Sequence, residues 1–290
     1  MQQKGPLMLG KKIVRRLKHE TISREHLWRP VGLPRYTQQT PLVESVCLMD
    51  NKTLGEWYAP VLITPAMIGS LASSPACIRE VITLLKRLEP DQYVEYLLGY
   101  YEAGLERFKN QWRYADITTA LLSVSQLLQP QNYLEIGVRR GRSMAMVAAT
   151  CPQCRIIGFD MWMEDYGNAQ NPGPDFVKKE LKKVGFQGKV QFVDGDSHRT
   201  VKEYLRSHPD EYYDLITVDG DHSLRGASLD LRDVLPRLKV GGAVIFDDIV
   251  QPHIEYLQNV WQRYVAGQMR FATWEYKDLG YGIAVGIRKY

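Results

Sequence analysis

Four acidic residues and one histidine near the ends of two apolar segments could do chemistry together. Asp219, Asp221 and His222 stand in the run VDGDHS, directly after the apolar run YYDLITV, and Asp247 and Asp248 end the run GGAVIFDD. Carboxylates gathered at one place repel one another, and a divalent cation among them makes the arrangement favourable. Oxygen ligands suit magnesium, calcium or manganese rather than zinc. The pattern therefore favours a divalent-cation site among the four acids Asp219, Asp221, Asp247 and Asp248.

A glycine-bearing turn lies upstream, in the run LEIGVRRGRS from Leu134 to Ser143. An apolar strand ends at Gly137, Gly141 follows, and Ser143 opens a run of helix formers, MAMVAA. Such a turn lets the backbone approach a ligand closely and points helix N-terminal amides at its charged group. The turn lacks the G-x-G-x-x-G spacing of dinucleotide sites, which disfavours a nicotinamide cofactor. We therefore expect a different nucleotide-containing cofactor at this turn.

The elements that would position these residues alternate between apolar strands and amphipathic helices from about Asn132 to the C-terminus. The apolar runs predict seven strands, at 132–137, 155–160, 189–194, 212–219, 241–248, 271–276 and 283–287. Helices are predicted between them, at 143–150, 175–184, 199–206, 224–238 and 253–265. The last two strands should pair as an antiparallel hairpin, because their connection is too short for a parallel crossover. The predicted fold class is α/β, a doubly wound, Rossmann-like seven-stranded sheet ending in that hairpin.

Taken together, the glycine turn, the DGD turn and the aspartate pair resemble those of the class I S-adenosylmethionine-dependent methyltransferases. Within that superfamily they are most similar to the metal-dependent O-methyltransferases. The catechol-type enzymes have a similar glycine turn, with residues that match Glu135, Gly137, Gly141 and Ser143, and the macrocin-type sugar enzymes share the EIGV and DGD turns. The resemblance covers roughly the last 160 residues, one ordinary domain's length. It implies S-adenosylmethionine as cofactor, together with Mg²⁺ or another divalent cation.

Five polar residues are expected to bind the cofactor besides the two glycines. Asp160, near the end of the second strand, can accept hydrogen bonds from ribose hydroxyls, and its alternative role is a helix cap. Glu135 lies inside an apolar strand and needs hydrogen bonds there, so it is expected near the cofactor's amino-acid end or in holding the turn. The resemblance implies that Ser143 meets the cofactor carboxylate and that Asp196 and Ser197 hold the adenine. Capping the next helix is the alternative for the last two.

Asp221 and His222 compete for the role of general base. Histidine titrates nearest to neutral pH, and a cation would keep a nearby carboxylate ionised, so both residues are chemically credible. The macrocin-type resemblance favours Asp221, whereas the catechol-type register places a lysine base at the position of His222. We favour Asp221 from the sequence. The resemblance also implies that Asp219, Asp247 and Asp248 hold the cation, which lowers the pKa of an acceptor hydroxyl; the alternative is a metal-free site in which the aspartate pair caps the next turn.

Residues 1–112 are expected to form a mostly helical N-terminal cap or arm, and residues 113–290 the methyltransferase domain. Several prolines interrupt the opening part, and helices are predicted at 78–88, 93–108 and 115–128. The cap would supply acceptor specificity or the surface of a homodimer. The loop 160–174 is a second candidate for acceptor contacts through Trp162 and Tyr166, unless these rings are only rim packing.

Composition is typical of a globular enzyme, with 290 residues, 44% of them hydrophobic and 24% charged. No long uncharged apolar run predicts a transmembrane segment. The net charge of +4, without a nucleic-acid-binding motif, does not favour a nucleic-acid partner. The basic opening, residues 1–20, is interpreted as a solvated or self-docked arm in preference to a membrane-surface segment. Cys151 and Cys154 have zinc-ligand spacing but no second pair, so free thiols of a cytoplasmic protein are expected.

We predict an enzyme that moves a methyl group from S-adenosylmethionine to a hydroxyl of a small molecule, such as a sugar or phenolic natural product. One alternative keeps the cofactor without the metal and uses nitrogen or carboxylate as acceptor. A second alternative, from another class, is a catalytically idle partner protein that retains the fold.

Overall fold

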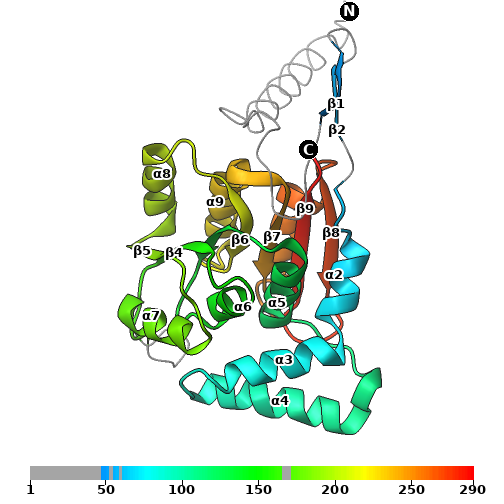
Figure 1. Cartoon of the computed structure of the whole chain (residues 1–290), viewed down its shortest axis with the longest axis vertical. Coiled ribbons are helices and arrows are strands. Elements are labelled where there is room, and N and C mark those ends of the chain that lie inside the picture. Colours follow the sequence, from blue (N-terminus) through cyan, green and yellow to red (C-terminus); the bar gives the residue numbers. More distant parts are fainter. Residues whose placement is uncertain (1–46, 52–54, 59–60, 165–170) are drawn as a thin grey trace, which may run out of the picture. The chain divides into compact units, whose positions relative to one another are not determined.

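The computed structural model describes residues 47–51, 55–58, 61–164 and 171–290, and Figure 1 shows its elements. The expectations about the basic opening segment and Tyr166 lie outside the described residues. Near the start of the described chain, β1 (Cys47–Asn51) and β2 (Gly55–Tyr58) pair antiparallel. This small hairpin was not predicted from the sequence.

The domain is built on a seven-stranded sheet with the order β5-β4-β3-β6-β7-β9-β8. Neighbouring strands from β5 to β7 pair in parallel, whereas β9 pairs antiparallel with β7 and with β8. The strands are β3 (Asn132–Ile136), β4 (Arg155–Asp160), β5 (Val190–Asp194), β6 (Tyr213–Val218), β7 (Leu238–Asp247), β8 (Phe271–Tyr276) and β9 (Ile283–Arg288). The predicted α/β class, with its terminal antiparallel hairpin, is confirmed.

Helices cover both faces of this sheet, as right-handed crossovers require. The chain runs outward from β3 to β5 through α6 and α7, and then crosses back to β6 and β7 through α8 and α9, which places the two pairs on opposite faces. The helices are α6 (Arg142–Thr150), α7 (Pro174–Lys183), α8 (Ser197–Ser207), α9 (Leu224–Val234) and α10 (Tyr256–Trp261). Short turns of 3₁₀ and π helix, Leu235–Arg237 and Gln262–Ala266, extend α9 and α10 to about the predicted ends.

In the part of the chain that the structure describes, four α-helices precede β3: α2 (Pro65–Ala72), α3 (Pro75–Leu85), α4 (Gln92–Phe108) and α5 (Ile117–Leu128). The prolines that interrupt the sequence here begin helices, since Pro65 and Pro75 occupy first positions and the side chains of Thr64 and Ser74 cap them. Proline suits this position because its missing N–H has no partner within the helix. Helix α2 was therefore missed by the sequence interpretation. The expected boundary between cap and domain, at residue 112, stays a prediction.

Within the described ranges, no single helix is long and apolar enough to cross a membrane. The neighbouring helices α2 and α3 meet the length and composition criteria only as a pair bent by 61°. Most of the apolar side chains of α3 lie in the core of the domain. Three cysteines whose side chains the structure describes, Cys77, Cys151 and Cys154, are buried free thiols, and burial raises the pKa of Cys151 to about 11.

Asp214 of β6 ties together the starts of three strands. Its Oδ2 accepts hydrogen bonds from the backbone N–H groups of Gln131, at 3.0 Å, and Asn132, at 2.9 Å, where β3 begins. Its Oδ1 lies 2.9 Å from Nζ of Lys239, near the start of β7. The Asp214 side chain is fully buried and that of Lys239 is 11% exposed. The negative charge of Asp214 and the positive charge of Lys239 therefore compensate each other.

We predict that Asp214→Ala lowers the free energy of unfolding by about 3–5 kcal/mol, because it leaves a buried ammonium and two backbone donors without partners. Urea denaturation followed by circular dichroism measures this loss. Lys239→Met keeps the aliphatic stem and leaves the two backbone hydrogen bonds of Asp214, so its cost should be smaller. Equal stability of Asp214→Ala and the wild type would contradict this account.

Candidate functional site

Gly137 brings the glycine turn into direct contact with the DGDH turn. It has a φ of +89°, and a Cβ placed on it would lie 1.9 Å from the backbone carbonyl oxygen of Asp219. Its own N–H donates to the carbonyl of Phe159 at 2.9 Å. Any side chain here would clash with backbone atoms, so glycine is required for the two turns to pack together. The predicted cofactor turn and the predicted acidic site are therefore neighbours.

Gly141 begins α6 with a φ of +72° and provides no side-chain cap. A Cβ on Gly141 would lie 2.5 Å from Cγ1 of Val177, in α7. The first amides of a helix have no partners within the helix and carry its partial positive charge. The turn therefore presents uncapped amides near the carboxyl end of β3, as an anion-binding turn does.

Glu135 and Ser143 bind each other. The Ser143 hydroxyl donates to Oε1 of Glu135, and the Tyr133 hydroxyl lies 2.8 Å from Oε2 of Glu135 and 2.9 Å from Oγ1 of Thr217. Glu135 is fully buried, and burial raises its pKa to about 8 against the opposing effect of the hydrogen bonds from Ser143 and Tyr133. These contacts join β3, β6 and the first turn of α6. The geometry favours the second role that the sequence allowed for Glu135, which is to hold the glycine turn. The hydroxyl of Ser143 is engaged by Glu135.

Asp160 also binds the glycine turn. Its Oδ2 accepts the backbone N–H of Arg139 at 2.6 Å, and its Oδ1 accepts the N–H of Trp162 at 2.6 Å. Asp194, at the end of the neighbouring β5, accepts a hydrogen bond from Nε1 of Trp162 at 2.6 Å. The sequence interpretation did not select Asp194, although its position at a strand end was visible. Both carboxylates lie at the sheet edge where ligands of α/β proteins bind.

Asp196 and Ser197 lie at the start of α8. Asp196 caps the helix by accepting the N–H of His198 at 2.9 Å, which is the structural role that the sequence left open for it. The Ser197 hydroxyl donates to Oδ1 of Asp230, in α9, at 2.8 Å. Asp230 is buried and was not selected from the sequence, because nothing in a helical pattern shows which carboxylate faces a distant loop. Its pKa is raised to about 6, first by burial.

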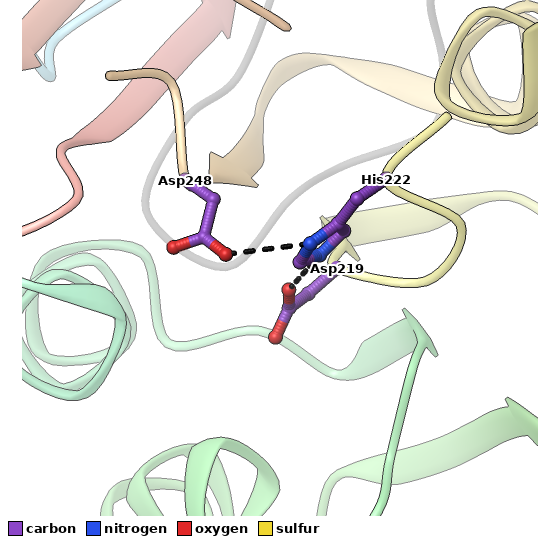
Figure 2. A group of neighbouring side chains, drawn as sticks. All are labelled: Asp219, His222 and Asp248. Carbon is purple, nitrogen blue, oxygen red and sulfur yellow. Dashed lines mark hydrogen bonds and ion pairs between the residues drawn. The ribbon is translucent and has the colours of Figure 1, made fainter. Parts of the chain in front are cut away.

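Three of the predicted chemical residues form one cluster, drawn in Figure 2. Nε2 of His222 lies 3.1 Å from Oδ1 of Asp219, and its Nδ1 lies 3.4 Å from Oδ2 of Asp248. One ligand atom from each of these residues lies within 4.8 Å of the others, which could hold a metal ion. The hydroxyl of Tyr256, in α10, donates to the carbonyl oxygen of His222 at 2.8 Å and supports the turn.

The charges of this cluster act strongly on one another. Burial, and then the charge of Asp219, raises the pKa of Asp248 to about 7. Burial and the charges of Asp248 and Asp219 raise the pKa of Asp247 above its ordinary value. Burial by itself would lower the pKa of His222, but the hydrogen bond to Asp219 and the nearby carboxylates outweigh it and raise that pKa. The site therefore carries repelling carboxylates that a proton or a cation would stabilise.

Asp221 points elsewhere. Its Oδ1 accepts the backbone N–H of Ser223 at 2.7 Å, and its Oδ2 accepts the hydroxyl of Ser223 at 3.0 Å. The nearest histidine contact is Nε2 of His198, 3.7 Å from Oδ2. Ser223 is the cap of α9. Asp221 therefore supports the start of α9, and His222 is the member of the DGDH turn that lies between Asp219 and Asp248.

A comparison with known proteins finds a family match for the central part of the chain. Residues 134–249 match the family model described as a methyltransferase domain. This segment contains the glycine turn, the DGDH turn and the aspartate pair.

A curated relative, tapetum-specific methyltransferase 1 of Arabidopsis thaliana, is 30% identical over 158 residues. The alignment covers 53% of this chain and 63% of the relative, so the chain spans somewhat less than two thirds of that protein.

Two solved structures resemble the chain at low sequence identity. The O-methyltransferase TomG from Streptomyces achromogenes is 16% identical, with a TM-score of 0.49, over 70% of this chain and 92% of that chain. An O-methyltransferase from Bacillus cereus is 14% identical, with a TM-score of 0.48, over 73% of this chain and 91% of that chain. Identities this low say nothing about the acceptor. Residues 134–249 are thus similar to a methyltransferase domain, and they lie in the seven-stranded sheet that the sequence predicts.

Proposed function

We propose that the protein transfers a methyl group from S-adenosylmethionine to a hydroxyl oxygen of a small molecule, with a divalent cation at the carboxylate cluster. The packing of Gly137 against Asp219 carries this proposal, because it joins the donor turn to the cluster. The donor supplies a methyl group already activated by its sulfonium, so the protein has to align two reactants and remove one proton. The acidic cluster and His222 suit an acceptor that loses a proton.

The residues fit a divalent cation. Asp219 and Asp248 offer hard oxygen ligands, which magnesium and manganese prefer, and the half-buried Asp247 precedes Asp248 in the chain. Burial first, and then the charges of neighbouring carboxylates, raise the pKa values of Asp247 and Asp248, and a cation beside them would oppose that rise. We assign cation binding to Asp219, Asp247 and Asp248, with His222 as a neighbour. A bound cation would lower the pKa of an acceptor hydroxyl.

His222 is better placed than Asp221 to take the proton. Asp219 holds the imidazole through Nε2, which leaves Nδ1, at 3.4 Å from Asp248, as the more loosely held nitrogen. We assign proton acceptance to Nδ1, because histidine titrates close to the working pH. Both carboxylate oxygens of Asp221 are occupied by Ser223, so we assign it to the support of α9.

On the donor side, the assignments follow the positions of the polar groups. Asp160 is proposed to receive the ribose hydroxyls, and the turn from Gly137 to Gly141 to receive the amino-acid end. We retain Asp196 and Ser197 as the residues beside the adenine. Glu135 and Ser143 hold the turn through their mutual hydrogen bond.

The contacts of His222 give one alternative a specific basis. An imidazolium between Asp219 and Asp248 would neutralise part of the negative charge without any metal. In that case the acceptor would be a nitrogen or a carboxylate, as in the metal-free alternative. Chelation experiments separate the two.

The acceptor is proposed to be a sugar or phenol hydroxyl, by resemblance to the macrocin-type and catechol-type enzymes. The same resemblance leads us to propose a natural-product substrate. We also propose a cytoplasmic location, which suits free thiols, and a homodimer formed through the N-terminal helices.

The first test concerns the donor. Asp160→Asn should weaken the binding of S-adenosylhomocysteine by roughly 10- to 100-fold, because charge-assisted hydrogen bonds to a ligand are lost. Isothermal calorimetry measures the affinity. Asp175→Asn, which removes the charge of an 86%-exposed carboxylate in α7, is the matched control and should leave the affinity unchanged. Wild-type affinity in Asp160→Asn, with the fold intact, would remove Asp160 from the donor site.

The second test concerns the cation. A chelator should abolish methyl transfer from radiolabelled S-adenosylmethionine to a panel of phenols and sugars, and added Mg²⁺ or Mn²⁺ should restore it. Binding of S-adenosylhomocysteine should change little, because the proposed donor contacts do not use the cation. Full transfer in excess chelator would favour the metal-free alternative instead.

The third test separates the two candidate bases. His222→Ala should reduce the turnover rate by roughly 10²–10⁴, the usual contribution of general base catalysis, with donor affinity kept. Asp221→Asn should be the milder change, because an amide still accepts a hydrogen bond from Ser223. Turnover is compared at several pH values, since an acceptor hydroxyl whose pKa a cation lowered would need less help from a base as pH rises. If Asp221→Asn is inactive and His222→Ala stays active, Asp221 is the general base, as the sequence favours.

A further inference from the structure

Asp91 connects the N-terminal helix α4 with the glycine turn. Its Oδ2 lies 2.7 Å from Nε of Arg140 and 2.5 Å from Nη2 of Arg142, the two residues that flank Gly141. Its Oδ1 accepts the backbone N–H of Val94 at 2.8 Å and so caps α4. One carboxylate thus starts a helix and binds two of the three arginines of a turn that follows far later in the chain.

This ionic group is mostly shielded from water. The side chains of Asp91, Arg140 and Arg142 are 17%, 9% and 11% exposed. Burial alone would raise the pKa of Asp91, but the N–H of Val94 and the two guanidinium groups outweigh it and lower that pKa. The carboxylate is therefore ionised near neutral pH. Its removal would leave two poorly solvated cations without their shared partner.

Aromatic rings hold both arginines from a second side. The guanidinium of Arg142 lies 4.7 Å from the ring centre of Tyr93, in α4, and that of Arg140 lies 4.5 Å from the ring centre of Phe176, in α7. A cation–π contact and an ion pair together restrict an arginine more than either contact alone. The conformation of the turn around Gly141 is therefore set in part by α4.

The start of α6 also lacks its expected side-chain ligand for an anion. The Ser143 hydroxyl is engaged by Glu135, so the amino-acid carboxylate of the donor must be met by the turn itself. Nε of Arg142 is buried and has no hydrogen-bond partner among the described residues. An unsatisfied buried donor is costly, and an anionic group at the start of α6 would relieve that cost.

We propose that Asp91 is a positioning residue of the donor site, which acts through Arg140 and Arg142 to hold the turn in the form that binds the donor's amino-acid carboxylate. This inference rests on the proposed function, because it assumes that the turn binds S-adenosylmethionine. It makes α4 a part of donor binding.

Two ligands that differ only at the amino-acid end test the proposal. Calorimetry compares S-adenosylhomocysteine with methylthioadenosine, which lacks the carboxylate and the amino group. Asp91→Asn removes the charge but keeps a good helix cap. We expect this substitution to weaken the binding of S-adenosylhomocysteine by about 10-fold or more, and that of methylthioadenosine by less than about 2-fold.

A matched control is available on the same helix. Glu102 of α4 forms a 2.7 Å ion pair with Lys86, is 52% exposed and does not touch the turn. Glu102→Gln should leave both affinities unchanged. If Asp91→Asn does not fold, Arg142→Lys, which keeps a cation beside Asp91, is measured with the same two ligands and should show the same selective loss.

The outcomes are distinguishable. If the wild type does not bind S-adenosylhomocysteine, the proposed function fails and this inference fails with it. If the wild type binds and Asp91→Asn binds both ligands equally well, only the inference is overturned. An equal loss of affinity for both ligands would assign Asp91 a structural role and would also overturn the inference.

Discussion

The contact between Gly137 and the carbonyl oxygen of Asp219 determines the spacing of the whole site. The glycine turn follows β3 and the DGDH turn follows β6, and these strands are neighbours in the sheet. Their turns can pack without a gap only because Gly137 has no Cβ, which would lie 1.9 Å from that oxygen. A donor placed on the first turn is then necessarily close to groups held by the second. The proximity that a transfer reaction needs is built into the backbone before any side chain contributes.

Buried polar groups give this backbone arrangement its rigidity. Glu135, Ser143, Tyr133 and Thr217 satisfy one another in the interior, where an unpaired polar group would be costly. The network connects β3, β6 and α6, the elements on either side of the close contact. Its members are therefore unavailable for the ligand contacts that the family resemblance implied for Ser143. The network makes the turn rigid but engages the Ser143 hydroxyl. Binding of a donor carboxylate at this turn would therefore depend on backbone amides and on neighbouring arginines.

The sequence predicts the sheet well because its strands are continuous apolar runs that end in glycine or aspartate. Parallel strands buried on both faces have that pattern, and their ends identify the edge where polar residues gather. Helix α2 was missed because Pro65 was interpreted as an interruption, whereas it begins the helix after the cap Thr64. Proline is equally compatible with both roles until the rest of the helix is weighed.

The direction of individual side chains could not be predicted in the same way. Asp221 and His222 are adjacent, yet Ser223 holds Asp221 at the start of α9 while His222 lies between Asp219 and Asp248. The contact of Asp221 with the helix cap Ser223, two residues away, cannot be read from a motif. Arg142, a partner of Asp91, lies 51 residues further along the chain. Their pairing depends on how whole helices pack together. Local pattern therefore locates the site, and tertiary packing assigns its members.

The titration behaviour of the cluster follows from its charge. Raised pKa values for Asp247, Asp248 and His222 all report an excess of negative charge in a poorly solvated place. A proton on His222 and a divalent cation relieve the same excess, so each should weaken the binding of the other. With a cation bound, His222 would lose part of the field that raises its pKa. The negative charge that would attract a cation is thus also what raises the pKa of the histidine, so the proposed ligand set and the proposed base depend on the same charges.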